Sequence, residues 1–304
     1  MRSNFFLFCL LAAVFVLACS KKNEPEIKDI EYVVRFRATG FTQLIENFSV
    51  KSRAVASTTN SNIKLIGTLY FVVFDTQGRV VKSIKQDTLK SVLFGAIELS
   101  LPAGNYRIAA VGAPDEKNTG QAQDYTMQIE SLDKFRISFI GNVKHVFCSE
   151  LFPFEVNADT SLEKELFLKR VSSQLDVIFD NVIPENAHYV VFEIPSIVGY
   201  NFFGQNQNNF AVKYRKEFGG LKGTSGVKFS IPIFGGEETS SSPKDLKISF
   251  YDQDDTVILT RSISNIRFEK NKITEVKGNI FEDPKNPFAV KISSNFDGQF
   301  DFIF

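Results

Sequence analysis

The 304-residue chain is 43% hydrophobic and 23% charged, which is typical of a folded protein with sizeable cores and excludes an intrinsically disordered one. Its 35 basic side chains equal its 35 acidic side chains and are scattered along the sequence, so no one-sided positive field is available for nucleic acid. The 32 Phe suit pleated, half-buried surfaces, and the absence of Trp argues against a platform for stacking sugars.

The first 18 residues have the pattern of a signal peptide. Arg2 supplies a positive start, and the stretch 5–17 supplies an apolar core. A transmembrane helix needs about 20 consecutive apolar residues, so this stretch is too short to span a bilayer comfortably. The sequence therefore favours a cleaved signal peptide over residues 1–18 rather than a membrane-spanning anchor.

The signal peptide ends in VLAC (16–19), a pattern that resembles the cleavage site of bacterial lipoproteins. Cys19 would then carry a diacyl group on its thiol and a palmitate-type chain on its new amine. Two or more chains give stable membrane anchoring, whereas one gives only marginal binding. The alternative is an ordinary signal peptide that happens to contain a cysteine. Residues 19–28 are polar and predict a short tether.

The first half of the mature chain predicts strands and one helix. Alternation predicts a strand over 30–41, and the apolar run 63–75 predicts a central strand that continues through a DTQG turn into 79–85 as a hairpin. A second hairpin is expected over 96–112, with its turn at 102–105. Three apolar residues spaced by three predict a short helix over 125–135; they are Ile129, Leu132 and Phe135.

Strands resume at residue 162 and change phase near Lys169 and Arg170, where a bulge or a domain crossing is expected. Further strands are predicted over 187–194 and 226–234, a long loop over 198–225, and hairpins over 245–263 and 266–281, the last with Asn271 at its tip. This predicts an all-β fold of two tandem sandwiches with one short helix. The expected divisions are 29–169, 170–282 and a final strand segment over 283–304.

The order of these segments resembles the fimbrillins and fimbrial anchor proteins of Bacteroidetes, which build lipoprotein-derived type V pili. The segments that carry the resemblance are the VLAC site, KSRAV (51–55), LYFVVFDTQGRVV (69–81), LPAGNYRIAAVG (101–112) and LFLKRVSSQLDVIFDNVIP (166–184). The resemblance covers most of residues 19–282 and is weak between 195 and 245. It implies transthyretin-like sandwiches.

The resemblance also implies roles for particular residues. Cys19 would hold the lipid in the outer membrane, with the protein exposed at the cell surface. Arg53 and Ala54 match the place where stalk subunits are cut by an arginine-specific protease, which frees a groove in the first sandwich. The C-terminal segment of a neighbouring fimbrial subunit then fills that groove as an added strand. Anchor members keep their lipid and their first strand.

The C-terminal stretch NFDGQFDFIF (295–304) places its Phe residues on one face and predicts a strand with one apolar face. This face could add to a sheet of another subunit, where main-chain hydrogen bonds give affinity and the aromatic side chains give register. Alternatively, the stretch is the last strand of its own second sandwich. The aromatic residues concerned are Phe296, Phe300, Phe302 and Phe304.

No combination of residues supports catalysis, a metal site or a cofactor. Cys148 lies among apolar residues and reads as a buried free thiol, and in an extended strand His145 would point to the opposite face. The acidic run at Asp252, Asp254 and Asp255 could suggest calcium, but it lacks further ligands and reads as a solvated turn. Motifs of phosphate loops, zinc sites and nucleophile elbows are absent from the sequence.

We therefore expect a structural fimbrial lipoprotein that is not an enzyme. The short tail after residue 281 favours an outer-membrane anchor or a tip or accessory subunit over a polymerising stalk subunit. The alternative is a glycan-binding surface lipoprotein of a nutrient-uptake system, which also uses tandem β-sandwiches. A flat cluster of solvent-facing Tyr and Phe would favour that alternative.

Overall fold

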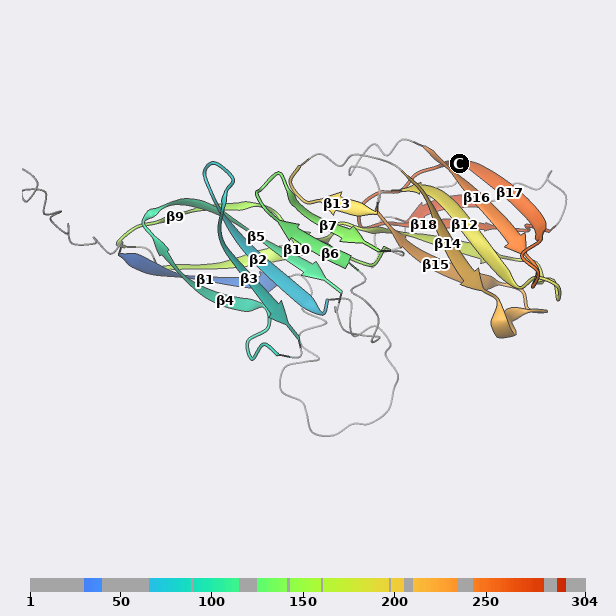
Figure 1. Ribbon diagram of the computed structural model, residues 1–304, viewed down its shortest axis with the longest axis horizontal. Helices are drawn as coiled ribbons and strands as arrows, with labels where there is room; N and C mark the ends of the chain where they lie inside the picture. The colour runs from blue at the N-terminus through green and yellow to red at the C-terminus, as the bar shows by residue number, and fades with distance from the viewer. Residues whose placement is uncertain are drawn as a thin grey trace, which may run out of the picture.

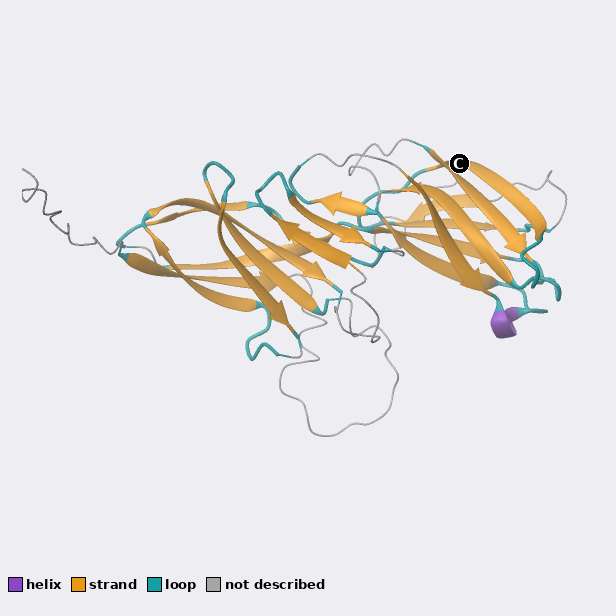
Figure 2. Cartoon of the chain, viewed as in Figure 1, coloured by secondary structure: helices purple, strands orange, loops and turns teal. Residues whose placement is uncertain are grey.

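The computed structural model describes residues 30–39, 66–88, 90–114, 125–140, 143–159, 161–196, 198–204, 210–234, 243–281 and 289–293. Their regular structure is β throughout, apart from one turn of 3₁₀ helix, η1 (Gly219–Leu221). The predicted all-β sandwich class is confirmed. Figures 1 and 2 show that the described strands form an elongated arrangement.

The first sandwich is one eight-stranded sheet that folds over its own core. Its strand order is β3-β2-β5-β8-β10-β1-β4, and β9 pairs with β5 beside β8. β1 lies antiparallel to β4 on one side and parallel to β10 on the other. The strands are β1 (Glu31–Thr39), β2 (Thr68–Asp75), β3 (Val80–Asp87), β4 (Ala96–Pro102), β5 (Gly104–Ala113), β8 (Phe147–Ser149), β9 (Phe152–Val156) and β10 (Leu162–Arg170).

Alternation along β1 determines which side chains enter this core. Val34, Phe36 and Ala38 are buried, and the residues between them face outward. β2 does not alternate because both of its faces are covered. Leu69, Phe71 and Val73 belong to the core of the first sandwich, whereas Tyr70, Val72 and Phe74 belong to a second apolar cluster. The unbroken apolar run of this strand is thus explained by double burial.

That second cluster lies under a small three-stranded sheet, ordered β13-β7-β6: β6 (Tyr125–Ile129), β7 (Phe135–Phe139) and β13 (Gly199–Asn201). The predicted helix over 125–135 is wrong, because β6 and β7 form an antiparallel hairpin. The three-residue spacing that suggested a helix arises because Ile129 ends one strand, Leu132 lies in the turn and Phe135 begins the next strand.

The second sandwich consists of two four-stranded sheets that share one core. The first sheet has the order β15-β11-β18-β19, and the second has the order β14-β12-β16-β17. The strands are β11 (Ser173–Phe179), β12 (Tyr189–Ser196), β14 (Phe210–Glu217), β15 (Val227–Ile233), β16 (Lys244–Tyr251), β17 (Val257–Ile266), β18 (Ile273–Gly278) and β19 (Ala289–Ser293).

Three further expectations about connections are wrong. β4 and β5 are not a hairpin: β4 pairs with β1 and β5 with β2, so residues 102–104 cross from one layer to the other. The expected hairpin over 266–281 also fails, since β18 pairs with β11 and β19, although Asn271 has the positive φ (58°) of a tight turn. The expected loop over 198–225 contains β13, β14 and η1.

Two predicted hairpins are confirmed, and their turns use an aspartate in the same way. β2 and β3 pair around Asp75, whose carboxylate accepts the backbone N–H groups of Gln77 and Arg79. β16 and β17 pair around Asp252, whose carboxylate accepts those of Asp254 and Thr256. An aspartate that bonds the backbone two residues ahead is a turn-forming device that the sequence shows directly.

Candidate functional site

The first strand, β1, is built into the middle of its layer. It pairs with β4 from Glu31 to Arg37 and with β10 from Val34 to Thr39, so both of its hydrogen-bonding edges are used. Its inward side chain Phe36 is 2% exposed and meets Phe154 edge-on, with ring centroids 5.0 Å apart. Such a strand is integral to the core and is not an exchangeable edge.

The outer face of β1 carries positive charge between two acidic neighbours. Arg35 donates from Nε to Glu98 on β4 at 2.8 Å and is in register with Glu163 on β10. Arg37 is in register with Glu165. Because the Arg35–Glu98 pair is more than half exposed, it contributes only about 0.2–1 kcal/mol. Its main effect is to favour one register of the strand, since a slip would separate these two opposite charges.

The site residues predicted from sequence lie outside the described residues; they are Cys19, Arg53, Ala54, Phe296, Phe300, Phe302 and Phe304. The elements next to them are described. β1 begins twelve positions after Cys19 and ends before Arg53. β19, an edge strand that pairs antiparallel with β18, ends just before the Phe-rich C-terminal stretch.

The sulfur chemistry agrees with a structural role for Cys148. The side chain is a buried free thiol on β8, as predicted, and its Sγ lies 3.1 Å from the carbonyl oxygen of Ser149. Burial raises the pKa of this thiol far above its usual range. A nucleophilic cysteine needs the thiolate form, so this thiol is unreactive where it stands.

His145, the nearest histidine in sequence, is partly buried. Its Nδ1 lies 3.2 Å from the hydroxyl of Ser172. Desolvation by the surrounding protein and, second, the charge of the nearby Arg170 lower the pKa of this imidazole to about 4. The ring is therefore neutral near pH 7, and its place is between β8 and the link that joins β10 to β11.

The acidic turn uses its carboxylates for its own structure. Asp252 caps the turn, and Asp255 accepts a hydrogen bond from the Tyr189 hydroxyl at 2.8 Å and lies 4.0 Å from Arg215. Over the part of the chain that the structure describes, no group of three or more His, Cys, Asp or Glu side chains is placed to hold a metal ion.

Aromatic side chains on the outer face of the second sandwich stack on each other. Tyr189 and Tyr251 lie parallel with centroids 4.7 Å apart, and the Arg215 guanidinium covers Tyr189 at 3.5 Å. Tyr189 is consequently only 5% exposed. Among side chains whose burial is described, Phe167 is the one exposed aromatic residue. The flat solvent-facing platform that would favour glycan binding is thus not found in the described residues.

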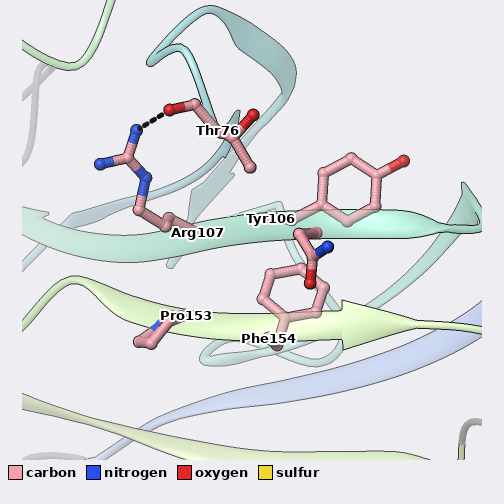
Figure 3. Close-up of a pocket in the computed structure, with 6 residues that line it drawn as sticks. Thr76, Tyr106, Arg107, Pro153 and Phe154 are labelled. Carbon is pink, nitrogen blue, oxygen red and sulfur yellow. Dashed lines mark hydrogen bonds between the residues drawn. The ribbon is translucent and has the colours of Figure 1, made fainter.

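A shallow pocket of about 370 Å³ lies between the β2–β3 turn and strands β5 and β9 (Figure 3). Arg107 forms one wall and donates to the carbonyl oxygens of Asp75 and Thr76, both at 3.1 Å. This arginine ties the turn to β5, a role that the sequence analysis missed because the two segments are distant in sequence. The lining contains no pair of groups suited to acid–base chemistry; it comprises Thr76, Asn105, Tyr106, Arg107, Pro153 and Phe154.

A structural contact between the two halves of the chain was also missed from sequence. β13 pairs with β7, and Tyr200 on β13 stacks on Phe234, with centroids 5.1 Å apart. Both residues belong to the apolar cluster that covers β2.

None of the helices in the described residues is long and apolar enough to cross a membrane.

Comparison with known proteins gives consistent results. The search of curated proteins returns no match. A family model described as fimbrillin-A associated anchor proteins Mfa1 and Mfa2 matches residues 42–295. The fimbrial anchor protein Mfa2 from Porphyromonas gingivalis is similar in structure, with a TM-score of 0.50 at 12% identity, covering 89% of this chain and 99% of that one.

Two further solved structures share the fold. A candidate polysaccharide-binding protein from Bacteroides thetaiotaomicron has a TM-score of 0.51 at 10% identity, covering 87% of this chain and 95% of that one. A candidate adhesin from Bacteroides ovatus has a TM-score of 0.50 at 14% identity, covering 76% and 82%. At these identities the likeness shows the fold alone. The match of the family model over most of the sequence shows that this chain belongs to the family of fimbrillin-A associated anchor proteins Mfa1 and Mfa2.

Proposed function

We propose that this protein is a structural subunit of a fimbrium and serves as its anchor in the outer membrane. Family membership supports a fimbrial role. The signal peptide over 1–18 and the VLAC pattern at 16–19 support export and lipid attachment at Cys19. The protein then works as a mechanical base at the cell surface, and its partners are the membrane lipid and other fimbrial subunits.

The observation that carries this proposal is the position of β1. The tether from Cys19 leads directly into a strand that is paired on both edges and buries Val34, Phe36 and Ala38. A lipid held by such a strand is connected to the core of the first sandwich. An anchor needs this connection throughout its working life.

Processing at Arg53 would act against that connection. A cut between Arg53 and Ala54 would separate β1 from the rest of the backbone, and only non-covalent contacts would then hold the lipid. In the anchor role the chain stays whole at this position. A tip or accessory role shares the same fold and lipid, and it differs in which subunits the protein contacts.

Assembly with other subunits would use strand addition, in which an extended segment pairs with the edge of a partner's sheet. The Phe-rich stretch over 295–304 follows the edge strand β19 and has the alternation that this mode requires. We also propose that the two sandwiches are domains over 29–169 and 170–282. β10 ends at Arg170 in the first sheet, and β11 begins at Ser173 in another.

A non-enzymatic role agrees with the chemistry of the described residues. The thiol of Cys148 is buried, and the imidazole of His145 is kept neutral by burial. The acidic groups at 252–255 serve their turn. These groups stabilise the fold, and none of them forms a nucleophile–base pair in the described part of the chain.

The test is metabolic labelling with radioactive palmitate in a host that processes lipoproteins. The unsubstituted protein should be labelled and recovered in the outer membrane, and Cys19→Ser should abolish both results. Cys9→Ser is the matched control, because this residue lies within the signal peptide and its loss should leave labelling unchanged. Equal labelling of the Cys19→Ser variant, or a mature protein that has lost residues 19–53, would overturn the anchor role.

A further inference from the structure

The connection between β12 and β14 makes an excursion away from the second sandwich. These two strands pair antiparallel along their full length, up to Ser196 and Phe210. A tight turn of about two to five residues is enough to join such a pair, whereas here residues 197–209 intervene. The described part of this connection, residues 198–204, reaches the small sheet that covers β2, where it forms β13 alongside β7 (Figure 1). We call residues 198–204 the clasp.

Backbone hydrogen bonds hold the clasp against β7 at both ends of β13. The N–H of Phe139 donates to the carbonyl oxygen of Val198 at 2.8 Å. The N–H of Phe202 donates to the carbonyl oxygen of Phe135 at 2.9 Å. The clasp is therefore added to the edge of β7 as a strand, and its position is fixed by the strand register.

Asn201 and Gly204 fasten the end of the clasp to the turn between β6 and β7. The Asn201 amide nitrogen donates to the carbonyl oxygen of Asp133, and the Asn201 amide oxygen accepts the N–H of Gly204 at 3.0 Å. A Cβ atom at Gly204 would lie 2.6 Å from the Asp133 carbonyl oxygen, well inside contact distance. Because a backbone carbonyl cannot move aside easily, this close approach requires glycine at position 204.

Aromatic rings connect the clasp to both sandwiches. Phe202 packs on Phe135 of β7 with ring centroids 4.9 Å apart, and Tyr200 stacks on Phe234 with centroids 5.1 Å apart. Phe234 directly follows β15 of the second sandwich, and its ring centroid lies 5.9 Å from that of Phe139 on β7. Phe135, Phe139, Tyr200 and Phe234 are each 5% exposed or less. Rings from β7, the clasp and the end of β15 thus share one buried apolar contact.

The covalent link between the sandwiches is short. β10 ends at Arg170 and β11 begins at Ser173, so Val171 and Ser172 make up the whole link. Val171 is buried in the same apolar cluster as Tyr200 of the clasp. Tandem domains move relative to each other by default, unless the contact between them is large and apolar. A link of two residues alone would be a hinge, and the clasp supplies the apolar contact that closes it.

We propose that the clasp is a built-in strap that fixes the second sandwich against the first, so that the two move as one rigid body. The link at 171–172 and the clasp are two separate connections, and together they prevent the rotation that a single connection allows. Opening the clasp would break its hydrogen bonds to β7 and expose the rings of Tyr200 and Phe234 at the same time.

The biological meaning of this joint rests on the proposed anchor function. A rigid joint gives the second sandwich one orientation relative to the first. A partner subunit that binds the second sandwich then does not have to pay the entropy of ordering a mobile domain. The joint itself does not depend on the lipid. Loss of palmitate labelling would overturn the anchor role and leave the joint intact, and failure of the joint would leave labelling at Cys19 unchanged.

The test measures the distance between two spin labels, one on each sandwich, by pulsed electron paramagnetic resonance. The protein is the full mature chain with Cys19→Ser, and the labels are attached at Lys82→Cys on β3 and Lys247→Cys on β16, two exposed positions. The remaining thiol, Cys148, is buried and should stay unlabelled.

Two clasp variants are compared with two matched controls. Gly204→Ala introduces the clash with Asp133, and its control is Gly220→Ala, where a Cβ atom meets nothing within 4 Å. Asn201→Ala is the milder clasp variant, because it removes two hydrogen bonds without a clash. Its control is Asn105→Ala, at an exposed position on β5.

The parent and both controls should give one narrow distance distribution, and each clasp variant should widen it at least about twofold. Hydrogen exchange is the second measurement. The amides of Phe139 and Phe202 should exchange faster in the clasp variants, whereas those of β1 and β16 should stay protected.

Equal widths in the parent and both clasp variants would overturn the proposal, because the link alone would then fix the joint. A broad distribution in the parent would overturn it as well. Loss of protection throughout β1 and β16 in both clasp variants would also overturn it, since the clasp would then be part of a folding core and not a joint.

Discussion

Replacement of His145 by Asn tests whether the fold keeps this imidazole neutral beside the link between the two sandwiches. The ring is partly buried beside the link between β10 and β11, and its Nδ1 lies 3.2 Å from the Ser172 hydroxyl. The same hydroxyl oxygen accepts the N–H of Val146 at 3.3 Å. Desolvation and, second, the charge of Arg170 lower the pKa of this imidazole from 6.5 to about 4. The folded protein therefore holds the ring neutral over a range of pH in which the unfolded chain protonates it.

The direction and size of the effect follow from this difference in pKa. Between pH 6.5 and about 4 the unfolded chain binds one more proton at His145 than the folded chain, so the free energy of unfolding falls as the pH falls. A difference of about 2.5 pKa units corresponds to about 3 kcal/mol at 1.36 kcal/mol per unit. Below about pH 4 the loss from this group levels off, and above pH 6.5 it is absent.

The assay is urea denaturation at about pH 7.5 and about pH 4.5, conditions that span most of this range. Carboxylates also titrate there, so the quantity to compare is the loss of stability of each variant between the two pH values. His145→Asn keeps a polar group near Nδ1 but cannot be protonated, and it should lose about 2–3 kcal/mol less than the parent. His188→Asn, which removes a half-exposed ring, is the control. If both variants lose as much as the parent, the burial argument for His145 is wrong.

Three other changes test the architecture. Phe36→Ala should lower the free energy of unfolding by about 3–5 kcal/mol in urea, since it removes a buried ring from β1; a loss below 1 kcal/mol would mean that β1 is not integral. Tyr106→Phe should cost about 1 kcal/mol in the same assay, because its hydroxyl donates to the Pro102 carbonyl oxygen at the layer crossing; no change would deny that bond a role. Cys148 should resist a thiol reagent in native buffer and react fully in denaturant, and rapid native labelling would contradict its burial.

The strands of this fold were predictable from local alternation, whereas their partners were not. The alternation of β1 and the Asp75 turn between β2 and β3 are visible in the sequence because they depend on neighbouring residues. The relation between β4 and β5 depends on the whole sheet. Their connecting residues look like a hairpin turn, yet each strand pairs with a distant one. Sequence shows where a chain turns, but tertiary packing decides whether it returns to the same layer.

The same reasoning explains the failed helix at 125–135 and the missed contact at β13. The hairpin of β6 and β7 forms because it buries the apolar outer face of β2. That face carries Tyr70, Val72 and Phe74. β13 adds to β7 from a position more than sixty residues later, in a stretch whose Gly and Asn content indicated a loop. Lipid attachment at Cys19 and strand addition by the Phe-rich tail stay predictions, because these residues lie outside the described ones. The position of β1 between β4 and β10 could not be predicted, because it depends on how these three strands align.

The placement of β1 between β4 and β10 has a mechanical consequence. A pull on the N-terminal end of β1 enters at Glu31 and acts along the axis of the strand. Both flanking ladders run parallel to that axis, so their hydrogen bonds are stretched sideways and share the force. Detachment then requires many bonds and the buried Phe36 to yield together, because no end of the ladder can open first. A strand hung at right angles from a sheet edge would instead peel away one bond at a time. The pairing of β1 on both edges therefore resists a force applied along this strand.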